Sequence, residues 1–383
     1  MPPKAPRCNT HVVLNPPQVS LLIEALTHRG YEVIGPTIRD GAILYDRVSS
    51  VDDLPKGWTD EQAGGKYKLK RREDDALFGY TVGPHAWKRF LFPASARLWK
   101  AQRTNGHFQI SPEEQKPPKR AFLGVRACEL HAIGIQDKVF LHGMFADPGY
   151  KSRRGDIFVV AVNCGQAGGT CFCSSMGTGP KAASGYDLSL TEVLHDSQHF
   201  LLVHVGTKAG AEVLKEIPTQ AAGEAEIAAA EALLEETARH MGRTLQTDGL
   251  KDLLYRNVES PRWDAVADRC LNCANCTMVC PTCFCSTIED VTDLSGQQAE
   301  RLRKWDSCFT TDFSYIHGGS LRATPRSKFR QWMMHKLAYW IDQFGTSGCV
   351  GCGRCITWCP VGIDLTEEAR AIRESEITVS TLV

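Results

Sequence analysis

Two cysteine runs near the carboxyl end of the chain have the same spacing. Each reads Cys-x2-Cys-x2-Cys-x3-Cys-Pro, and the closing prolines are Pro281 and Pro360. The eight cysteines are Cys270, Cys273, Cys276 and Cys280 in the first run and Cys349, Cys352, Cys355 and Cys359 in the second. Two-residue spacers allow three successive thiolates to turn toward one centre, and this is the spacing at which bacterial ferredoxins ligate 4Fe–4S clusters. The pattern predicts two such clusters and a fold that holds both loops together.

In two-cluster proteins of this type, the fourth cysteine of each run ligates the other cluster. One cluster is therefore expected to take Cys270, Cys273, Cys276 and Cys359, and the other Cys349, Cys352, Cys355 and Cys280. A structural zinc site is the competing interpretation, because two Cys-x2-Cys pairs can supply the four thiolates of one tetrahedral site. Zinc would leave the other motif cysteines without a role, so iron–sulfur ligation is the better interpretation. Adjacent clusters in one domain pass electrons but do not by themselves convert a substrate.

The composition indicates a cytoplasmic globular protein. The 383 residues include 44 Lys and Arg against 44 Asp and Glu, a balance that argues against a chain built to bind nucleic acid or an anionic membrane surface. The sequence has no apolar run near the roughly 18 residues of a membrane span, and its first residues lack the apolar segment of a signal peptide. Because thiols stay reduced in the cytoplasm, the 16 cysteines are expected to be metal ligands or redox groups.

Upstream of the cysteine runs, the chain alternates apolar strands with helical patterns. We expect strands over 121–127, 156–163 and 199–206. Their near-continuous apolar sequence predicts a sheet covered on both faces. Residues 66–73 and 76–82 are expected to form a further pair of short strands, with the lysines of the first at a solvated edge.

The insert between the two cysteine runs reads as mostly helical. The predicted fold class is therefore an α+β or α/β region over 1–247, followed by a mainly α-helical, ferredoxin-like 4Fe–4S dicluster domain over 248–383.

Four further cysteines belong to the α/β region: Cys128, Cys164, Cys171 and Cys173. Cys128 directly follows the first expected strand, and Cys164 directly follows the second. If these strands are parallel neighbours, both thiols lie at the carboxyl edge of the sheet, where α/β folds place their ligands. The glycine-rich loop before Cys171 then returns the last two thiols to the same edge. The set predicts a third 4Fe–4S cluster, with a zinc site or free thiols as the alternatives.

Three cysteines, Cys283, Cys285 and Cys308, are one short of a full cluster. They are expected either to lie buried against the dicluster or to form a site that an outside ligand completes. Nucleotide-binding and nucleophile-elbow motifs are missing from the sequence. We therefore expect no catalytic residue in this chain and place flavin and nicotinamide sites on another subunit.

The chain resembles the beta subunit of the cytosolic NAD(P)-linked nickel–iron hydrogenases, or sulfhydrogenases, and the related iron–sulfur subunit of anaerobic sulfite reductase. The resemblance covers about residues 75 to 365. It is carried by GVRACELHAIGIQDKVF, YKSRRGDIFVVAVNC, TCFCSSMGTGP, CLNCANCTMVCPTCFC, RKWDSCF and GCVGCGRCITWCP.

This resemblance implies an electron-transfer subunit of a multi-subunit oxidoreductase. It would relay electrons between a flavin- and NAD(P)-binding diaphorase subunit and the small and large hydrogenase subunits, with no membrane and no nucleic acid among its partners. The eight motif cysteines carry over residue by residue, and the four α/β cysteines are favoured as a set. A sulfite reductase complex is the alternative. An Fe–S or zinc module that binds nucleic acid is an alternative of another class, based on the basic runs at 66–72 and 301–336.

Overall fold

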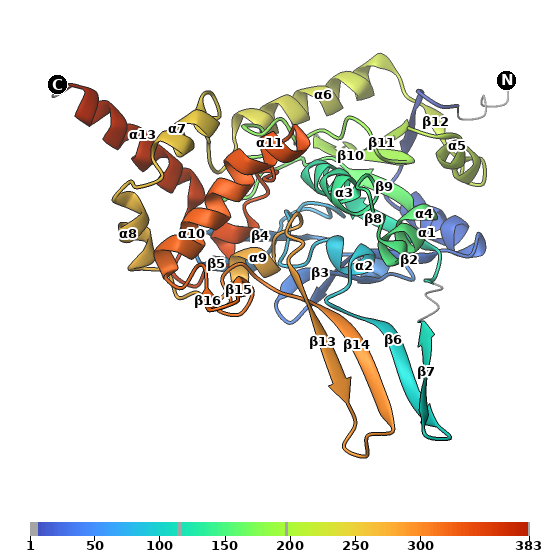
Figure 1. Ribbon diagram of the computed structural model, residues 1–383. Coiled ribbons are helices and arrows are strands. Elements are labelled where there is room, and N and C mark those ends of the chain that lie inside the picture. Colours follow the sequence, from blue (N-terminus) through green and yellow to red (C-terminus); the bar gives the residue numbers. More distant parts are fainter. Residues whose placement is uncertain (1–6, 113–116, 196–197, 382–383) are drawn as a thin grey trace.

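The computed structural model describes residues 7–112, 117–195 and 198–381. Within these residues an eight-stranded mixed sheet forms the centre of the amino-terminal part (Figure 1). In spatial order its strands are β12 (Gln220–Ala221), β1 (His11–Leu14), β11 (Gln198–Val205), β10 (Leu188–His195), β9 (Phe158–Val162), β8 (Arg120–Val125), β2 (Glu32–Arg39) and β3 (Ala42–Arg47). The strands β2, β8, β9 and β10 are parallel neighbours, and the outer strands pair antiparallel.

Helices cover both faces of this sheet. They are α1 (Gln18–His28), α2 (Lys88–Leu91), α3 (Ala127–Phe140), α4 (Pro148–Gly155), α5 (Lys208–Leu214) and α6 (Glu224–Arg239), with a short 3-10 turn η1 at Val51–Asp53. On one face, α1 and α5 pack against strand residues such as Leu123 and Val160. On the other, α2, α3 and α4 pack against Phe122 and Val159, and α6 covers β10 and β11. The predicted two-sided burial of the central strands is confirmed.

The predicted pairing of residues 66–73 with 76–82 is wrong. The strand β5 (Lys66–Arg71) pairs instead with β4 (Trp58–Ala63). Residues 76–82 are buried but form no strand, because side chains bind their backbone. The Glu192 carboxylate accepts hydrogen bonds from the amides of Leu77 and Phe78, both at 2.7 Å. The Glu192 carboxylate thus accepts backbone hydrogen bonds that a neighbouring strand would accept in a sheet.

The carboxyl-terminal part packs its helices around a core that includes Trp263, Phe329 and Trp332. The helices are α7 (Leu250–Arg256), α8 (Arg262–Ala267), α9 (Asn275–Met278), α10 (Pro325–Met334), the π-helical turn η2 (His335–Tyr339), α11 (Trp340–Phe344), α12 (Arg354–Thr357) and α13 (Leu365–Thr381). In the described part of the chain, no helix has the length and apolar character needed to cross a bilayer.

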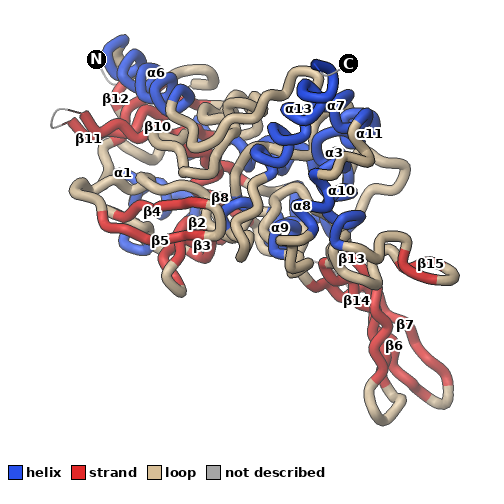
Figure 2. The backbone as a smooth tube through the Cα atoms, turned by 90° about the vertical axis from the view of Figure 1, so that its left-hand side faces the viewer, coloured by secondary structure: helices blue, strands red, loops and turns tan. Residues whose placement is uncertain are grey.

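Contrary to the prediction, the insert between the cysteine runs is not mainly helical. It contains β13 (Ser286–Thr292), β14 (Gln298–Trp305), β15 (Tyr315–Ile316) and β16 (Gly319–Ser320). The β13–β14 hairpin joins a second hairpin, β6 (Ser95–Thr104) and β7 (His107–Pro112), in a four-stranded antiparallel sheet. This sheet projects from the body of the molecule as an arm (Figures 1 and 2). The predicted domain boundary after residue 247 stays a prediction, and the β6–β14 pairing joins strands from both sides of it.

The cysteine-rich part and the α/β part meet through direct backbone contact. Gly351 and Gly353 have left-handed φ angles of +65° and +74°. The amide of Phe172 donates a hydrogen bond to the carbonyl of Gly351 at 2.8 Å. A Cβ atom on Gly353 would lie 2.4 Å from the carbonyl oxygen of Thr170. The loop of the second cysteine run therefore requires glycine both for its backbone angle and for space.

Substituting Gly353→Ala is expected to lower the free energy of unfolding by more than the left-handed conformation alone costs. Gly345→Ala is the matched control, because Gly345 also has a φ of +69° but nothing lies within 4 Å of its added Cβ. The control should lose about 1–2 kcal/mol, and Gly353→Ala about 1–3 kcal/mol more from crowding. Urea unfolding of anaerobically purified protein measures both. Equal losses would contradict the close packing of the two parts.

Candidate iron–sulfur sites

The two cysteine runs fold into matching loops. In the first, Asn272 and Ala274 have left-handed φ angles of +51° and +65°, and in the second Gly351 and Gly353 occupy the corresponding positions with +65° and +74°. Each loop leads into a short helix, α9 or α12. The repeated left-handed residues curl the backbone around a centre, so that successive thiols turn to the same side.

The structure brings thiols of the two runs together, and the crossed assignment of ligands stays a prediction. Cys355 and Cys359 of the second run line a common cavity with Cys270, Cys273 and Cys276 of the first. Conversely, burial raises the pKa of Cys355, and the next contributions come from Cys349, Cys352 and Cys280. Buried thiols that raise one another's pKa values are unfavourable as free thiolates, and binding to iron removes this penalty. The donor sets fit the two clusters that the spacing predicts.

The third set, Cys128, Cys164, Cys171 and Cys173, also converges. The strands β8 and β9 are parallel neighbours as expected, so Cys128 and Cys164 lie at the same sheet edge. Burial is the largest cause that raises the pKa of Cys171, and the neighbouring thiols of Cys173 and Cys164 raise it further. Burial likewise raises the pKa of Cys128, and the next largest contributions to that rise come from Cys173 and Cys352. These four thiols therefore lie together and adjoin the second motif set.

A contact through Cys171 joins the third set to the second motif loop. Its Sγ lies 3.8 Å from the carbonyl oxygen of Cys352. Cys128, Cys173 and Cys352 also share one small buried cluster with Val82 and Trp340. The three thiol sets thus follow one another through the protein without an intervening layer of water-exposed residues.

Two buried arginines, Arg126 and Arg354, lie where the third set meets the second motif loop. The sequence analysis did not identify either of them. Arg126 is 1 % exposed and donates hydrogen bonds to the carbonyls of Asn163, Phe78 and Tyr80 at 3.1, 2.9 and 2.7 Å. It therefore fixes the backbone just before Cys164. Because its charge lies beside Cys164, it acts to lower the pKa of that thiol, against the larger effect of burial.

Arg354 forms a buried ion pair with Glu129 at 2.5 Å, and the side chains are 0 % and 1 % exposed. Glu129 also accepts hydrogen bonds from Tyr45 Oη at 2.8 Å and Trp87 Nε1 at 3.0 Å. Because Glu129 follows Cys128 on α3 and Arg354 precedes Cys355 on α12, the pair connects the third set to the second motif. The sequence carries no signal that Glu129 and Arg354 pair, because each is a single charged residue among mostly apolar neighbours.

Lys336 is another site residue that the sequence analysis missed. It lies in the π-helical turn η2, a rare element often found at functional sites. Its ammonium donates hydrogen bonds to Cys280 Sγ at 3.1 Å and to Thr282 Oγ1 at 3.0 Å. Thr282 in turn donates to the carbonyl of Gly348 at 2.7 Å. The lysine thus binds the one thiol of the first run that is expected to ligate the second cluster.

Several cations of the basic runs form ion pairs with nearby carboxylates. Arg301 and Lys304 form ion pairs with Asp290 and Glu289 on the neighbouring strand. Earlier in the chain, Arg72 pairs with Asp74. These local ion pairs count against the phosphate-binding alternative. Cys8 is exposed and belongs to none of the thiol sets.

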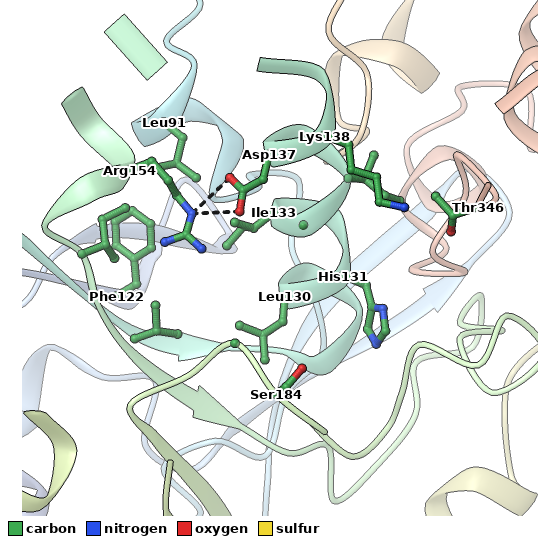
Figure 3. Close-up of a pocket in the computed structure, with 15 residues that line it drawn as sticks. Leu91, Phe122, Leu130, His131, Ile133, Asp137, Lys138, Arg154, Ser184 and Thr346 are labelled. Atoms are coloured by element: carbon green, nitrogen blue, oxygen red, sulfur yellow. Dashed lines mark hydrogen bonds and ion pairs between the residues drawn. The ribbon is translucent and has the colours of Figure 1, made fainter. Parts of the chain in front are cut away.

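A cavity on the outer side of α3 is separate from the thiols (Figure 3). Leu130 and Ile133 form part of its apolar wall. On its wall, Asp137 accepts hydrogen bonds from Arg154 Nε at 3.1 and 3.2 Å, and it also accepts one from Tyr150 Oη at 2.7 Å. This arrangement indicates a structural ion pair beside the sheet rather than a reactive centre.

Comparison with known proteins agrees with the thiol geometry. Residues 269–363 match the family model of the 4Fe-4S dicluster domain. Sulfhydrogenase 2 subunit beta from Pyrococcus furiosus is 30% identical over 348 residues, which cover 90% of this chain and 93% of that protein. No solved structure matches the chain significantly.

The buried pair at the junction generates a stability prediction. Glu129→Gln keeps the size of the side chain but leaves the Arg354 charge buried without its anion, so unfolding free energy should fall by about 3–5 kcal/mol. Glu236→Gln is the control, because the ion pair of Glu236 with Arg239 is exposed and should contribute at most about 1 kcal/mol. Urea unfolding under anaerobic conditions compares the two. Similar small losses for both variants would show that the buried pair does not hold the junction.

Proposed function

The chain belongs to the family of sulfhydrogenase beta subunits, and from this premise we propose that it relays electrons through three 4Fe–4S clusters within a soluble hydrogenase complex. Its role as an iron–sulfur electron-transfer subunit follows from the family and the dicluster domain. The finer proposal is the route: a flavin- and NAD(P)-binding subunit at one end, and the small and large hydrogenase subunits at the other.

The contiguity of the three thiol sets carries this proposal. We assign Cys270, Cys273, Cys276 and Cys359 to one cluster, Cys349, Cys352, Cys355 and Cys280 to a second, and Cys128, Cys164, Cys171 and Cys173 to a third. This assignment is supported by the cavity that thiols of both runs line, and by the Cys171–Cys352 contact between the second and third sets. A continuous series of sites through one chain suits electron relay between partners at different surfaces.

The clusters, when bound, supply one-electron carriers. The chain's own residues hold them and exclude water, since Cys128, Cys171 and Cys173 are each at most 8 % exposed. Arg354 and Arg126 place fixed positive charge beside the second and third sets. Burial, hydrogen bonds to sulfur and nearby charge are the means by which a protein sets cluster potentials. We propose no substrate-converting site in this chain.

A variant of the third set tests the relay. Cys173→Ser in the assembled complex should lose about four irons per chain, the content of one 4Fe–4S cluster, and the NAD(P)H-linked hydrogenase activity should fall at least tenfold. Hydrogen oxidation with an artificial dye should persist, because it does not require the relay. Cys8→Ser is the matched control and should change neither quantity.

The same experiment separates the alternatives. Unchanged NAD(P)H-linked activity in an iron-depleted Cys173→Ser complex would remove the third set from the electron route. A sirohaem absorption band with sulfite reduction, in place of hydrogenase activity, would assign the subunit to a sulfite reductase complex instead.

A further inference from the structure

The two ends of the β13–β14 hairpin bring together two cysteines that have no place in the relay, Cys285 and Cys308. Cys285 immediately precedes β13, and Cys308 follows β14 by three residues. At the root of the hairpin Ser286 pairs with Trp305, and the amide of Asp306 donates to the carbonyl of Cys285 at 2.9 Å. The register of the hairpin therefore places two thiols distant in sequence beside each other.

Cys283 completes this group. A hydrogen bond with Cys280 and burial raise the pKa of Cys283, and Cys285 is a further neighbour that acts on it. A hydrogen bond with Cys308 lowers the pKa of Cys285 to about 7. Cys283, Cys285 and Cys308 thus form a thiol trio that adjoins Cys280 but supplies none of the twelve relay ligands proposed above.

Two buried lysines face the trio. Lys88 is 5 % exposed and Lys336 is 6 % exposed. Lys88 Nζ donates to the carbonyl of Cys283 at 3.1 Å and lies 3.9 Å from the ring centroid of Trp305. Lys336 donates to Cys280 Sγ. Among the ion pairs of the described residues, neither lysine has a carboxylate partner. A buried ammonium is unfavourable without a compensating anion, and the ionisable groups that would compensate these two lysines are the neighbouring cysteines.

Aromatic side chains line one side of this region, and the three trio cysteines are half-buried. Phe284, between two of the trio cysteines, contacts Phe140 and Trp340 with ring centroids 6.3 and 5.8 Å apart. Cys308 packs against the core that contains Trp332. Partly buried cysteines with cationic neighbours and an apolar wall are surroundings in which proteins can hold iron–sulfur clusters.

We propose that Cys283, Cys285 and Cys308 bind a further iron–sulfur cluster through three thiolates, with Lys88 and Lys336 as its buried counter-charges. Three protein ligands suit either a three-iron cluster or a four-iron cluster whose last iron takes a non-protein ligand. A single zinc ion fits less well, because no three Cys, His, Asp or Glu side chains of the described residues are arranged around one ion. The site lies where the arm joins the body and next to the second relay cluster, so it forms a branch of the relay.

The ligand test compares iron, acid-labile sulfide and zinc in three anaerobically purified complexes: unsubstituted, Cys285→Ser/Cys308→Ser, and the Cys8→Ser control. The double variant should lose three or four irons per chain, with matching sulfide, while Cys8→Ser loses none. The three-iron form is identified if the double variant loses three irons and the oxidised unsubstituted complex shows an EPR signal that the double variant lacks. A loss of four irons identifies the four-iron form with one non-protein ligand. Unchanged iron, or loss of zinc in place of iron, would overturn the proposal.

A second variant keeps the proposal testable if the double variant does not assemble. Lys88→Met removes a counter-charge but no ligand, so iron should stay complete while one midpoint potential becomes more negative. Lys66→Met, on the exposed end of β5, is its control and should leave every potential unchanged. Full iron content with no potential shifted in Lys88→Met would contradict the assigned counter-charge. Neither test depends on the third relay set, because Cys173 is intact in both.

Discussion

The buried ion pair between Glu129 and Arg354 is the interaction on which the arrangement of the sites depends. Both side chains are removed from water, so each charge would be strongly unfavourable without the other. The pair joins the first turn of α3, which carries Cys128, to α12, which begins beside Cys355. Because it is fixed by further hydrogen bonds from Tyr45 and Trp87, it holds the sheet edge and the dicluster loop in one register.

Burial explains why so many charged groups gather around the thiols. An iron–sulfur cluster with its thiolates is an anion, and an apolar surrounding would disfavour it without nearby positive charge. Arg126, Arg354 and Lys336 are all at most 6 % exposed, and each lies beside a cysteine. Arg126 and Arg354 also bind carbonyls or a carboxylate, and Lys336 binds the hydroxyl of Thr282, so these residues support both the backbone and the electrostatics of the sites.

Local patterns in the sequence predict the parts of the site that depend on local backbone geometry. The motif spacing predicts three thiols of each motif set, because each loop is closed by residues a few positions apart. The crossed fourth ligand is expected from the general pattern of two-cluster proteins. The third set is predictable because β8 and β9, which precede Cys128 and Cys164, are parallel neighbours. The rest depends on distant partners: β14 pairs with β6, and Lys88 reaches Cys283. A helical expectation for the insert fails because this pairing, not local propensity, stabilises the strands.

The most direct measurement of the central claim is the iron, acid-labile sulfide and zinc content of the anaerobically purified protein, together with the fraction of the iron that NAD(P)H reduces in the complex. The account predicts about twelve irons per chain in the three relay clusters and about three or four more in the thiol trio, with the relay iron reducible by NAD(P)H and no stoichiometric zinc. About eight irons, or zinc bound at the cysteines of the α/β region, would contradict a continuous relay through the three thiol sets.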